Sequence, residues 1–249
     1  MNIYKQPPKD WKDLQVKVAE ILSVCGYHCK VEKDIQTLRE TINVDVLAIN
    51  SQDIPSSTLI CECKYWNSKV PKTIIHSLRT TVADFGANYG IIISKKGFQS
   101  GCFEAVSNTN ILLFNWTEFQ TYFLTKWIGG KTLQTSILTS ALYNYVSAGF
   151  LVFFKDELSN LNEQELMTFN NLNSEYFHPA FHSSNLDYKD VATHKFDLNF
   201  FNEHVTQVEK IFSQQFDSYI DYFEYLVNKC AEGTRKFDLL FKQQLRRSQ

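Results

Sequence analysis

The sequence predicts an α/β domain, built as a mixed central sheet flanked by helices, followed by a C-terminal α-helical domain. Two observations predict this arrangement. In the first half, apolar segments alternate with amphipathic ones in the order helix, three strands, helix, strand, helix, strand, helix, which implies a mixed sheet covered by helices. Past Gly129 and Gly130 the strand pattern largely stops, and a glycine pair is a typical boundary signal. We therefore place an α/β domain at residues 1–128 and a helical domain at residues 129–249.

Each element of the first domain follows from a local pattern. Residues 10–25 carry apolar side chains at helical spacing, and Asp10 and Gly26 are suited to begin and end a helix. On this helix Gln15 borders the buried face. Apolar segments predict strands at 27–32, 43–49, 58–65, 90–94 and 111–114, and amphipathic segments predict helices at 71–85, 98–107 and 117–127.

The second domain is expected to be helical. We expect one long helix or two at 132–154, a short helix at 162–172, a long helix at 200–231 and a last helix after Gly233. Residues 176–193, which include Pro179, are expected to form a loop. The aromatic residues at 200–223 exceed what one buried stripe needs. They indicate a core, or an interface with a second copy of the chain or with another protein.

The composition excludes several classes of protein. The 249 residues carry 25 Lys and Arg against 27 Asp and Glu, which excludes a strongly basic, sequence-blind DNA coat and requires any nucleic-acid contact to come from a local patch. No apolar run reaches the ~18 residues of a membrane span, and the N-terminus lacks the apolar stretch of a signal peptide. We therefore expect a soluble cytoplasmic protein with no membrane partner, whose six cysteines are reduced.

Three charged residues stand out in two otherwise apolar strands. Glu62 and Lys64 lie two positions apart in one strand, so their side chains share a face. Asp45 is the only charge in the preceding strand, and a turn between the strands would place it near Glu62. Two carboxylates and a backbone carbonyl suit Mg²⁺, and a lysine beside them positions or deprotonates a water, or stabilises developing charge. The alternative is a structural ion pair or an inactive nuclease fold, but a buried charge trio is costly for stability alone.

The order and spacing of these parts resemble the PD-(D/E)xK nuclease superfamily, and more closely the catalytic domain of type IV, Mrr-like restriction endonucleases. The resemblance covers residues 10–120, and its matching segments are 25–27 (Cys-Gly-Tyr), 44–46 (Val-Asp-Val), 62–66 (Glu-Cys-Lys-Tyr-Trp) and 90–94 (Gly-Ile-Ile-Ile-Ser). It implies a restriction-endonuclease-like fold in which Asp45, Glu62 and Lys64 are catalytic. Mg²⁺ would then be held by the two carboxylates and the carbonyl of Cys63. Family members often carry a glutamate where this chain has Gln15. The resemblance therefore makes Gln15 a further catalytic candidate, although its side chain carries no charge.

The same resemblance implies a set of nucleic-acid contacts. His76 and Arg79 lie on the helix after the Glu62 strand, where family members place groups near the scissile phosphate. Lys69 and Lys72 lie at the start of that helix, whose N-terminus is itself suited to an anion. A second group, Ser94, Lys95 and Lys96, leaves the end of the next strand and is suited to phosphate contact. The alternative for His76 is an exposed helix histidine with no role in the site. The alternative for Lys95 and Lys96 is a solvated turn.

These features together predict a Mg²⁺-dependent endonuclease, with Mn²⁺ as a substitute, that cleaves DNA, and double-stranded DNA is the expected substrate. By family analogy its setting is bacterial restriction or anti-phage defence. One alternative is a non-catalytic or partner-activated module in a larger defence assembly, with the helical half as its docking surface. Another is a nuclease for RNA or single-stranded DNA. A homodimer or a protein partner would bind through the helical half.

Overall fold

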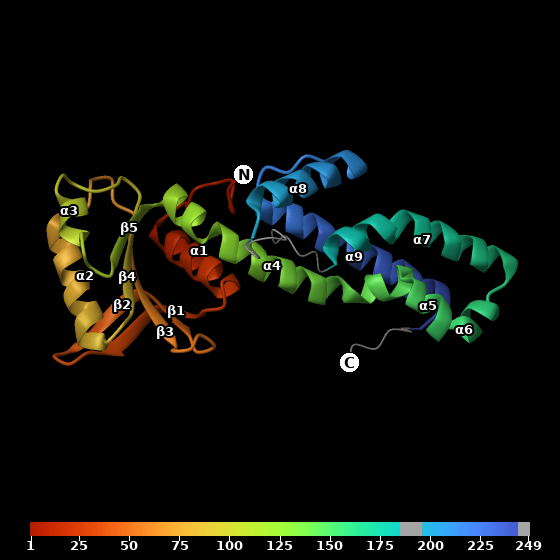
Figure 1. Cartoon of the computed structure of the whole chain (residues 1–249), viewed down its shortest axis with the longest axis horizontal. Helices are drawn as coiled ribbons and strands as arrows, with labels where there is room; N and C mark the ends of the chain where they lie inside the picture. The colour runs from red at the N-terminus through yellow and green to blue at the C-terminus, as the bar shows by residue number, and fades with distance from the viewer. Residues whose placement is uncertain (185–195, 244–249) are drawn as a thin grey trace. The chain divides into compact units, whose positions relative to one another are not determined.

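The computed structural model describes residues 1–184 and 196–243. They divide into two compact units, Asn2–Gly130 and Lys131–Gln249. The first unit contains the sheet, and the second is built from helices (Figure 1). None of the helices within the described ranges is both long enough and apolar enough to cross a membrane.

A five-stranded mixed sheet forms the centre of the first unit. Its strands are β1 (His28–Gln36), β2 (Thr41–Asn50), β3 (Ser57–Lys64), β4 (Tyr89–Ser94) and β5 (Ile111–Asn115), in the spatial order β1-β2-β3-β4-β5. The first three pair antiparallel, and β3, β4 and β5 pair parallel. The interior strand β4 is an apolar run buried from its second residue on, as expected for a strand covered on both faces. The predicted mixed α/β fold is confirmed.

Helices cover both faces of this sheet. The helices α2 (Lys72–Phe85) and α3 (Cys102–Val106) lie on one side, and α1 (Trp11–Val24) lies on the other (Figure 1). The side chain of Asp10 caps α1 by accepting a hydrogen bond from the Asp13 N–H, and Gly86, with φ 78°, ends α2. The helix α3 is shorter than the predicted helix at 98–107.

The glycine pair that marked the predicted boundary lies inside a helix. The helix predicted at 117–127 continues as α4 (Trp116–Val146), so Gly129 and Gly130 form no linker. Each glycine costs a helix about 1 kcal/mol relative to alanine. At Gly130 a packing reason offsets that cost, because a Cβ there would overlap the carbonyl oxygen of Val24. This glycine therefore permits a close approach between helices rather than a turn.

The second unit contains α5 (Ala148–Phe153), α6 (Lys155–Ser159), α7 (Glu163–Ser183), α8 (Leu198–Phe212) and α9 (Tyr219–Phe241), together with the second part of α4. Packing of α7 against α9 dominates this unit. Gly233 on α9 lies against the ring of Tyr176, where an added Cβ would stand 2.5 Å from Cδ1. The fully buried aromatic residues of its core include Tyr145, Tyr176 and Phe237.

Three helix boundaries of this unit differ from the prediction. Residues 176–183 are helical rather than a loop, because α7 continues through Pro179 with Tyr176 and Ala180 buried. The remainder of the predicted loop, from residue 185, lies outside the described residues. The predicted long helix is two, α8 and α9, which separate after Ser213 with its positive φ of 50°. Gly233 lies within α9 instead of separating two helices. Residues 132–154 contain the last part of α4 and all of α5, which agrees with the two-helix alternative.

A buried histidine pair in the second unit predicts a loss of stability in acid. Burial, and secondarily His182, whose ring centroid is 4.9 Å away, lowers the pKa of His204 from 6.5 to about 4. The folded state therefore favours the neutral ring, so its contribution is complete above pH 6.5 and is lost as the pH falls toward 4. The change corresponds to about 3 kcal/mol.

Urea unfolding at pH 7.5 and pH 4.5 measures this effect. A His204→Phe variant keeps an aromatic ring but cannot titrate, so it should lose less stability than the wild type between the two pH values. An equal loss in both proteins would mean that His204 is not the group responsible.

Candidate active site

Two adjacent strands bring three charged side chains together. The register of β2 and β3 pairs Val46 with Cys61, which places Asp45 beside the end of β3. Lys64 Nζ lies 2.7 Å from Glu62 Oε2 and 3.9 Å from Asp45 Oδ2. Each of these three side chains is about one-fifth exposed, at 17–22%. The charged groups therefore reach solvent from a largely buried setting.

The carboxylate of Asp45 is held in one orientation by two hydrogen bonds. Gln15 Nε2, on α1, donates to Asp45 Oδ1 at 2.8 Å. The backbone N–H of Cys63 donates to Asp45 Oδ2 at 2.6 Å. Gln15 is only 4% exposed, so its amide is fixed by the core around it. The polar edge of the first helix thus meets the first carboxylate of the site.

The electrostatics of this group favour an added cation. Burial, and then the neighbouring charge of Asp45, raises the pKa of Glu62, while the ion pair with Lys64 opposes the rise. The carboxylates of Asp45 and Glu62 are thus both near a single cation, Lys64, in a partly desolvated environment. Two carboxylates with a backbone carbonyl are hard oxygen ligands, which fit Mg²⁺ with waters completing its shell. Among the described residues no group of three or more His, Cys, Asp or Glu side chains could hold a metal ion.

Cys63 can contribute to such a site through its backbone only. Its thiol is buried, and burial raises its pKa well above 9. The side chain is therefore a neutral thiol rather than a thiolate ligand.

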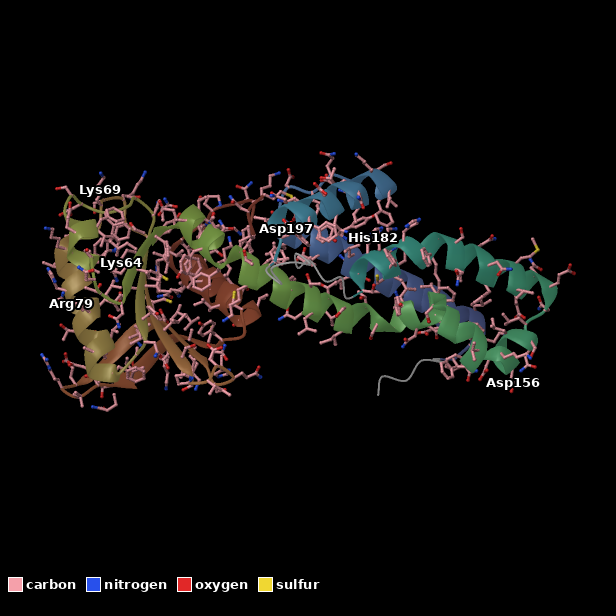
Figure 2. All side chains as sticks on the ribbon, in the orientation of Figure 1. Lys64, Lys69, Arg79, Asp156, His182 and Asp197 are labelled. Atoms are coloured by element: carbon pink, nitrogen blue, oxygen red, sulfur yellow. The ribbon has the colours of Figure 1, made fainter. Side chains whose placement is uncertain are left out.

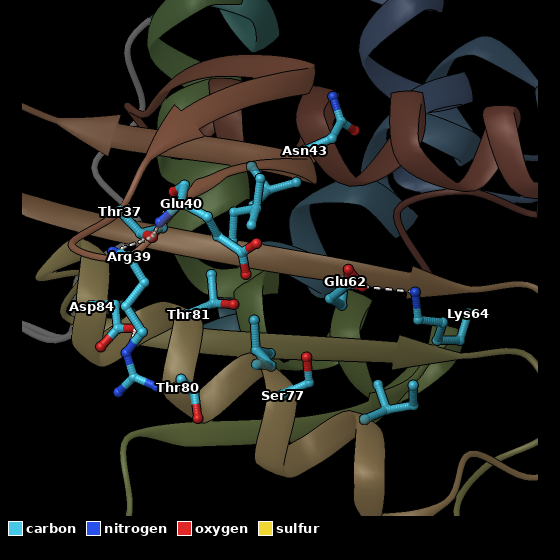
Figure 3. A pocket seen from close by; sticks show the side chains of 14 residues that line it. Thr37, Arg39, Glu40, Asn43, Glu62, Lys64, Ser77, Thr80, Thr81 and Asp84 are labelled. Atoms are coloured by element: carbon cyan, nitrogen blue, oxygen red, sulfur yellow. Dashed lines mark hydrogen bonds and ion pairs between the residues drawn. The ribbon is translucent and has the colours of Figure 1, made fainter.

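A cavity of about 420 Å³ opens beside Glu62 and Lys64 (Figure 3). It runs between the turn that joins β1 to β2 and the adjacent face of α2. An ion pair between Arg39 Nε and Asp84 Oδ2, 3.0 Å long, lies at its far end. The sequence did not single out Arg39 or the α2 residues of this cavity. The sequence feature that could have indicated the α2 residues is a polar stripe at helical spacing, formed by Ser77, Thr80, Thr81 and Asp84.

The basic residues predicted on or before α2 do not line this cavity. Lys69, Lys72, His76 and Arg79 are all exposed, and Figure 2 shows Lys69 and Arg79 on the α2 side of the sheet. The Nζ of Lys72 lies close to Gly101, before α3. These four side chains are thus open to solvent outside the cavity, and their assignment as nucleic-acid contacts stays a prediction.

The residues predicted at the end of β4 have separate surroundings. Ser94 is buried and its hydroxyl donates to the carbonyl of Gly97 at 2.9 Å. Lys95 Nζ donates to Asn67 Oδ1 at 3.0 Å and lies 4.1 Å from the ring centroid of Tyr65. Lys96 is exposed. Of this group, only the two lysines present their side chains to solvent.

The sheet topology, the helices on its two faces and the carboxylates and lysine on β2 and β3 define a restriction-endonuclease-like domain. Residues 9–123 match the family model for Mrr catalytic domains, described as restriction endonuclease. Residues 9–123 therefore form a restriction endonuclease domain of the Mrr, PD-(D/E)xK type, which accounts for somewhat less than half of the chain.

The crystal structure of a protein of unknown function, AF1548, is similar at 16% sequence identity and a TM-score of 0.39. The alignment covers 70% of this chain and 95% of that one. No curated protein sequence matches significantly.

Proposed function

We propose that the chain is a metal-dependent endonuclease that hydrolyses phosphodiester bonds in DNA, with double-stranded DNA as its main substrate. The observation that carries the proposal is the convergence of Asp45, Glu62 and Lys64 in a restriction-endonuclease domain. The restriction activity for which the family is named favours a role in defence against foreign DNA.

The proposed chemistry assigns a role to each side chain of the site. Asp45, Glu62 and the carbonyl of Cys63 would hold Mg²⁺ or Mn²⁺, which when bound makes a water more acidic and polarises a phosphoryl oxygen. Lys64 Nζ would orient the attacking water or take its proton, or stabilise negative charge on the phosphate. Gln15 and the Cys63 N–H would keep the Asp45 carboxylate in position. Gln15 thus acts through Asp45 and is a positioning residue.

The substrate panel for this proposal is plasmid, linear duplex, single-stranded DNA and RNA. Each is incubated with Mg²⁺, with Mn²⁺ and with EDTA. Cleavage of the plasmid with either metal and not with EDTA is expected. Cleavage of RNA alone would change the substrate class, and undiminished cleavage in EDTA would remove the metal from the proposal.

Replacing Gln15 with leucine should lower activity and weaken the response to metal. Leucine keeps the volume of the side chain but removes the donor to Asp45 Oδ1. Losing a hydrogen bond that orients a metal ligand typically costs 10–100-fold in metal affinity or activity. We expect the Mg²⁺ concentration for half-maximal cleavage to rise by that factor. Gln99→Leu, at an exposed position, is the matched control, and an unchanged Mg²⁺ requirement in Gln15→Leu would contradict the positioning role.

The second candidate function is a partner-activated or non-catalytic module. Residues 131–249 carry 11 basic and 15 acidic side chains, and several large apolar side chains on their helices are exposed, among them Leu133, Ile137, Leu138, Phe177 and Phe181. An acidic and apolar surface suits a protein partner or a second copy better than it suits DNA. Light scattering at several concentrations tests the dimer, and tolerance of Asp45→Asn in a functional assay would favour the non-catalytic module.

A further inference from the structure

The cavity beside Glu62 and Lys64 is lined by uncharged polar and apolar side chains as well as by charged ones. Ser77 and Thr81 of α2 supply hydroxyl groups to the lining, and within the described part of the chain neither side chain makes a hydrogen bond. A hydroxyl both donates and accepts. The apolar part of the lining comes from Ile42, Val44, Ile74 and Leu78. Such a surface suits a flat apolar ring system with hydrogen-bonding edges.

The charges of the cavity disfavour a phosphate group within it. Lys64 is paired with Glu62, and Arg39 is paired with Asp84. Glu40 also lines the cavity, and no ion pair of its carboxylate occurs among the described residues. Figure 3 shows this carboxylate extending from the β1–β2 turn over the cavity. An unpaired carboxylate repels phosphate but accepts a hydrogen bond from the amino group of a base, as it does from cytosine N4.

The size and position of the cavity suit a single base of the substrate. A volume of about 420 Å³ lies in the range of sites that enclose a small organic molecule, roughly 300–1,000 Å³. One end of the cavity is formed by Glu62 and Lys64, so its occupant would adjoin the group on which these residues act. A base stacked and paired within a duplex cannot enter such a cavity, whereas an unpaired base rotated out of the stack can.

We propose that this cavity binds one unpaired nucleobase of the substrate strand, next to the phosphate that is cleaved. The inference rests on the nuclease function proposed above and narrows its substrate class. A duplex that contains a bulged, mismatched or single-stranded nucleotide becomes a better substrate than a fully paired one. Bases that carry an amino group should bind best, because Glu40 is an acceptor.

Binding of two labelled duplexes to the full-length chain tests the proposal. Both have the same sequence and one extra nucleotide, which is a cytidine in one duplex and an abasic residue in the other. Fluorescence anisotropy in EDTA measures binding without metal-dependent turnover. We expect the bulged cytidine to bind at least tenfold more tightly than the abasic bulge, because only the cytidine fills the cavity.

A pair of tryptophan variants assigns this preference to the cavity. Ser77→Trp fills the cavity from an exposed helix position and should reduce the preference to less than twofold. Ala83→Trp adds the same side chain to an exposed position of α2 that does not line the cavity, and it should keep the preference. Equal affinity of the wild type for the two duplexes, or loss of the preference in both variants, would overturn the assignment.

Free cytidine monophosphate shows whether the cavity binds a base within a DNA strand or a free nucleotide. If it binds the wild type but not Ser77→Trp, by ligand-observed NMR, while the two duplexes bind equally, then the cavity is a site for a free nucleotide and the proposal fails. Cleavage of the same duplexes with Mg²⁺ separates the cavity from the catalytic proposal. If the bulged cytidine binds more tightly than the abasic bulge but no substrate is cleaved, the proposed nuclease function is contradicted and the cavity assignment is not. Equal binding and equal cleavage of both duplexes would contradict the cavity assignment alone.

Discussion

Replacing Lys64 with alanine is expected to lower the rate of DNA cleavage by ~10²–10⁴-fold, the range for loss of a group that moves a proton in the transition state. The reason is geometric, because its Nζ lies 2.7 Å from Glu62 and 3.9 Å from Asp45. It is thus the cation placed where a water and a phosphate would meet the two carboxylates. Single-turnover cleavage of a plasmid, with enzyme in excess, measures the effect on the chemical step.

The control for this variant must separate lost chemistry from lost structure. Lys30→Ala removes an exposed lysine of β1 and should cleave at the wild-type rate. The thermal unfolding of Lys64→Ala should remain cooperative. Alanine at Asp45 or Glu62 should likewise abolish cleavage. Full activity in Lys64→Ala would contradict the catalytic role of this lysine and the proposed mechanism that depends on it.

The first unit could be predicted because its local and its long-range signals agree. The run from Gly90 to Ser94 is apolar because both faces of its strand are covered. Period-two alternation placed Glu62 and Lys64 on one face, and the short connection between β2 and β3 made antiparallel pairing with the Asp45 strand the simplest arrangement. The three charged residues could therefore be brought together from the sequence alone.

The helical unit could be predicted in class but not in its boundaries. Gly130, Pro179 and Gly233 are local signals that predict the end of a helix, but all three lie inside helices. At Gly130 and Gly233 the missing Cβ permits contact with a distant segment. Such a reason is invisible in a short window of sequence, because it depends on which element packs there.

The site shows the same division between local and distant information. The helical wheel placed Gln15 at the edge of the buried face, but it could not supply the acceptor, Asp45, which lies on a strand 30 residues away. The cavity was missed because Arg39 and Asp84 come from a hairpin turn and a helix end that only the fold brings together. Polar residues on one helix face are ordinarily solvated, so the stripe on α2 carried no signal by itself.

Replacing Phe237 with alanine should destabilise the helical unit by about 3–5 kcal/mol, the usual cost of removing a fully buried phenylalanine ring. Phe237 has no exposed surface. Its ring stacks on Tyr145 at a centroid distance of 4.9 Å and meets the edge of Phe169 at 5.8 Å. Truncation therefore leaves a cavity between α4, α7 and α9. Urea unfolding followed by circular dichroism measures the loss.

Leu239→Ala is the matched control, because Leu239 lies two residues further along α9 and is 77% exposed. It should change stability by no more than about 0.5 kcal/mol. A loss below 1 kcal/mol in Phe237→Ala would contradict the assignment of this ring to the core. The same variant also tests how the two units depend on each other, since Phe237 lies in the helical unit and the catalytic candidates lie in the other. Plasmid cleavage is then measured at a denaturant concentration that unfolds the helical unit of Phe237→Ala. If cleavage persists, the nuclease unit acts without the helical unit. If cleavage is lost while the α/β unit stays folded, the helical unit is required for activity, and the partner-activated alternative gains support.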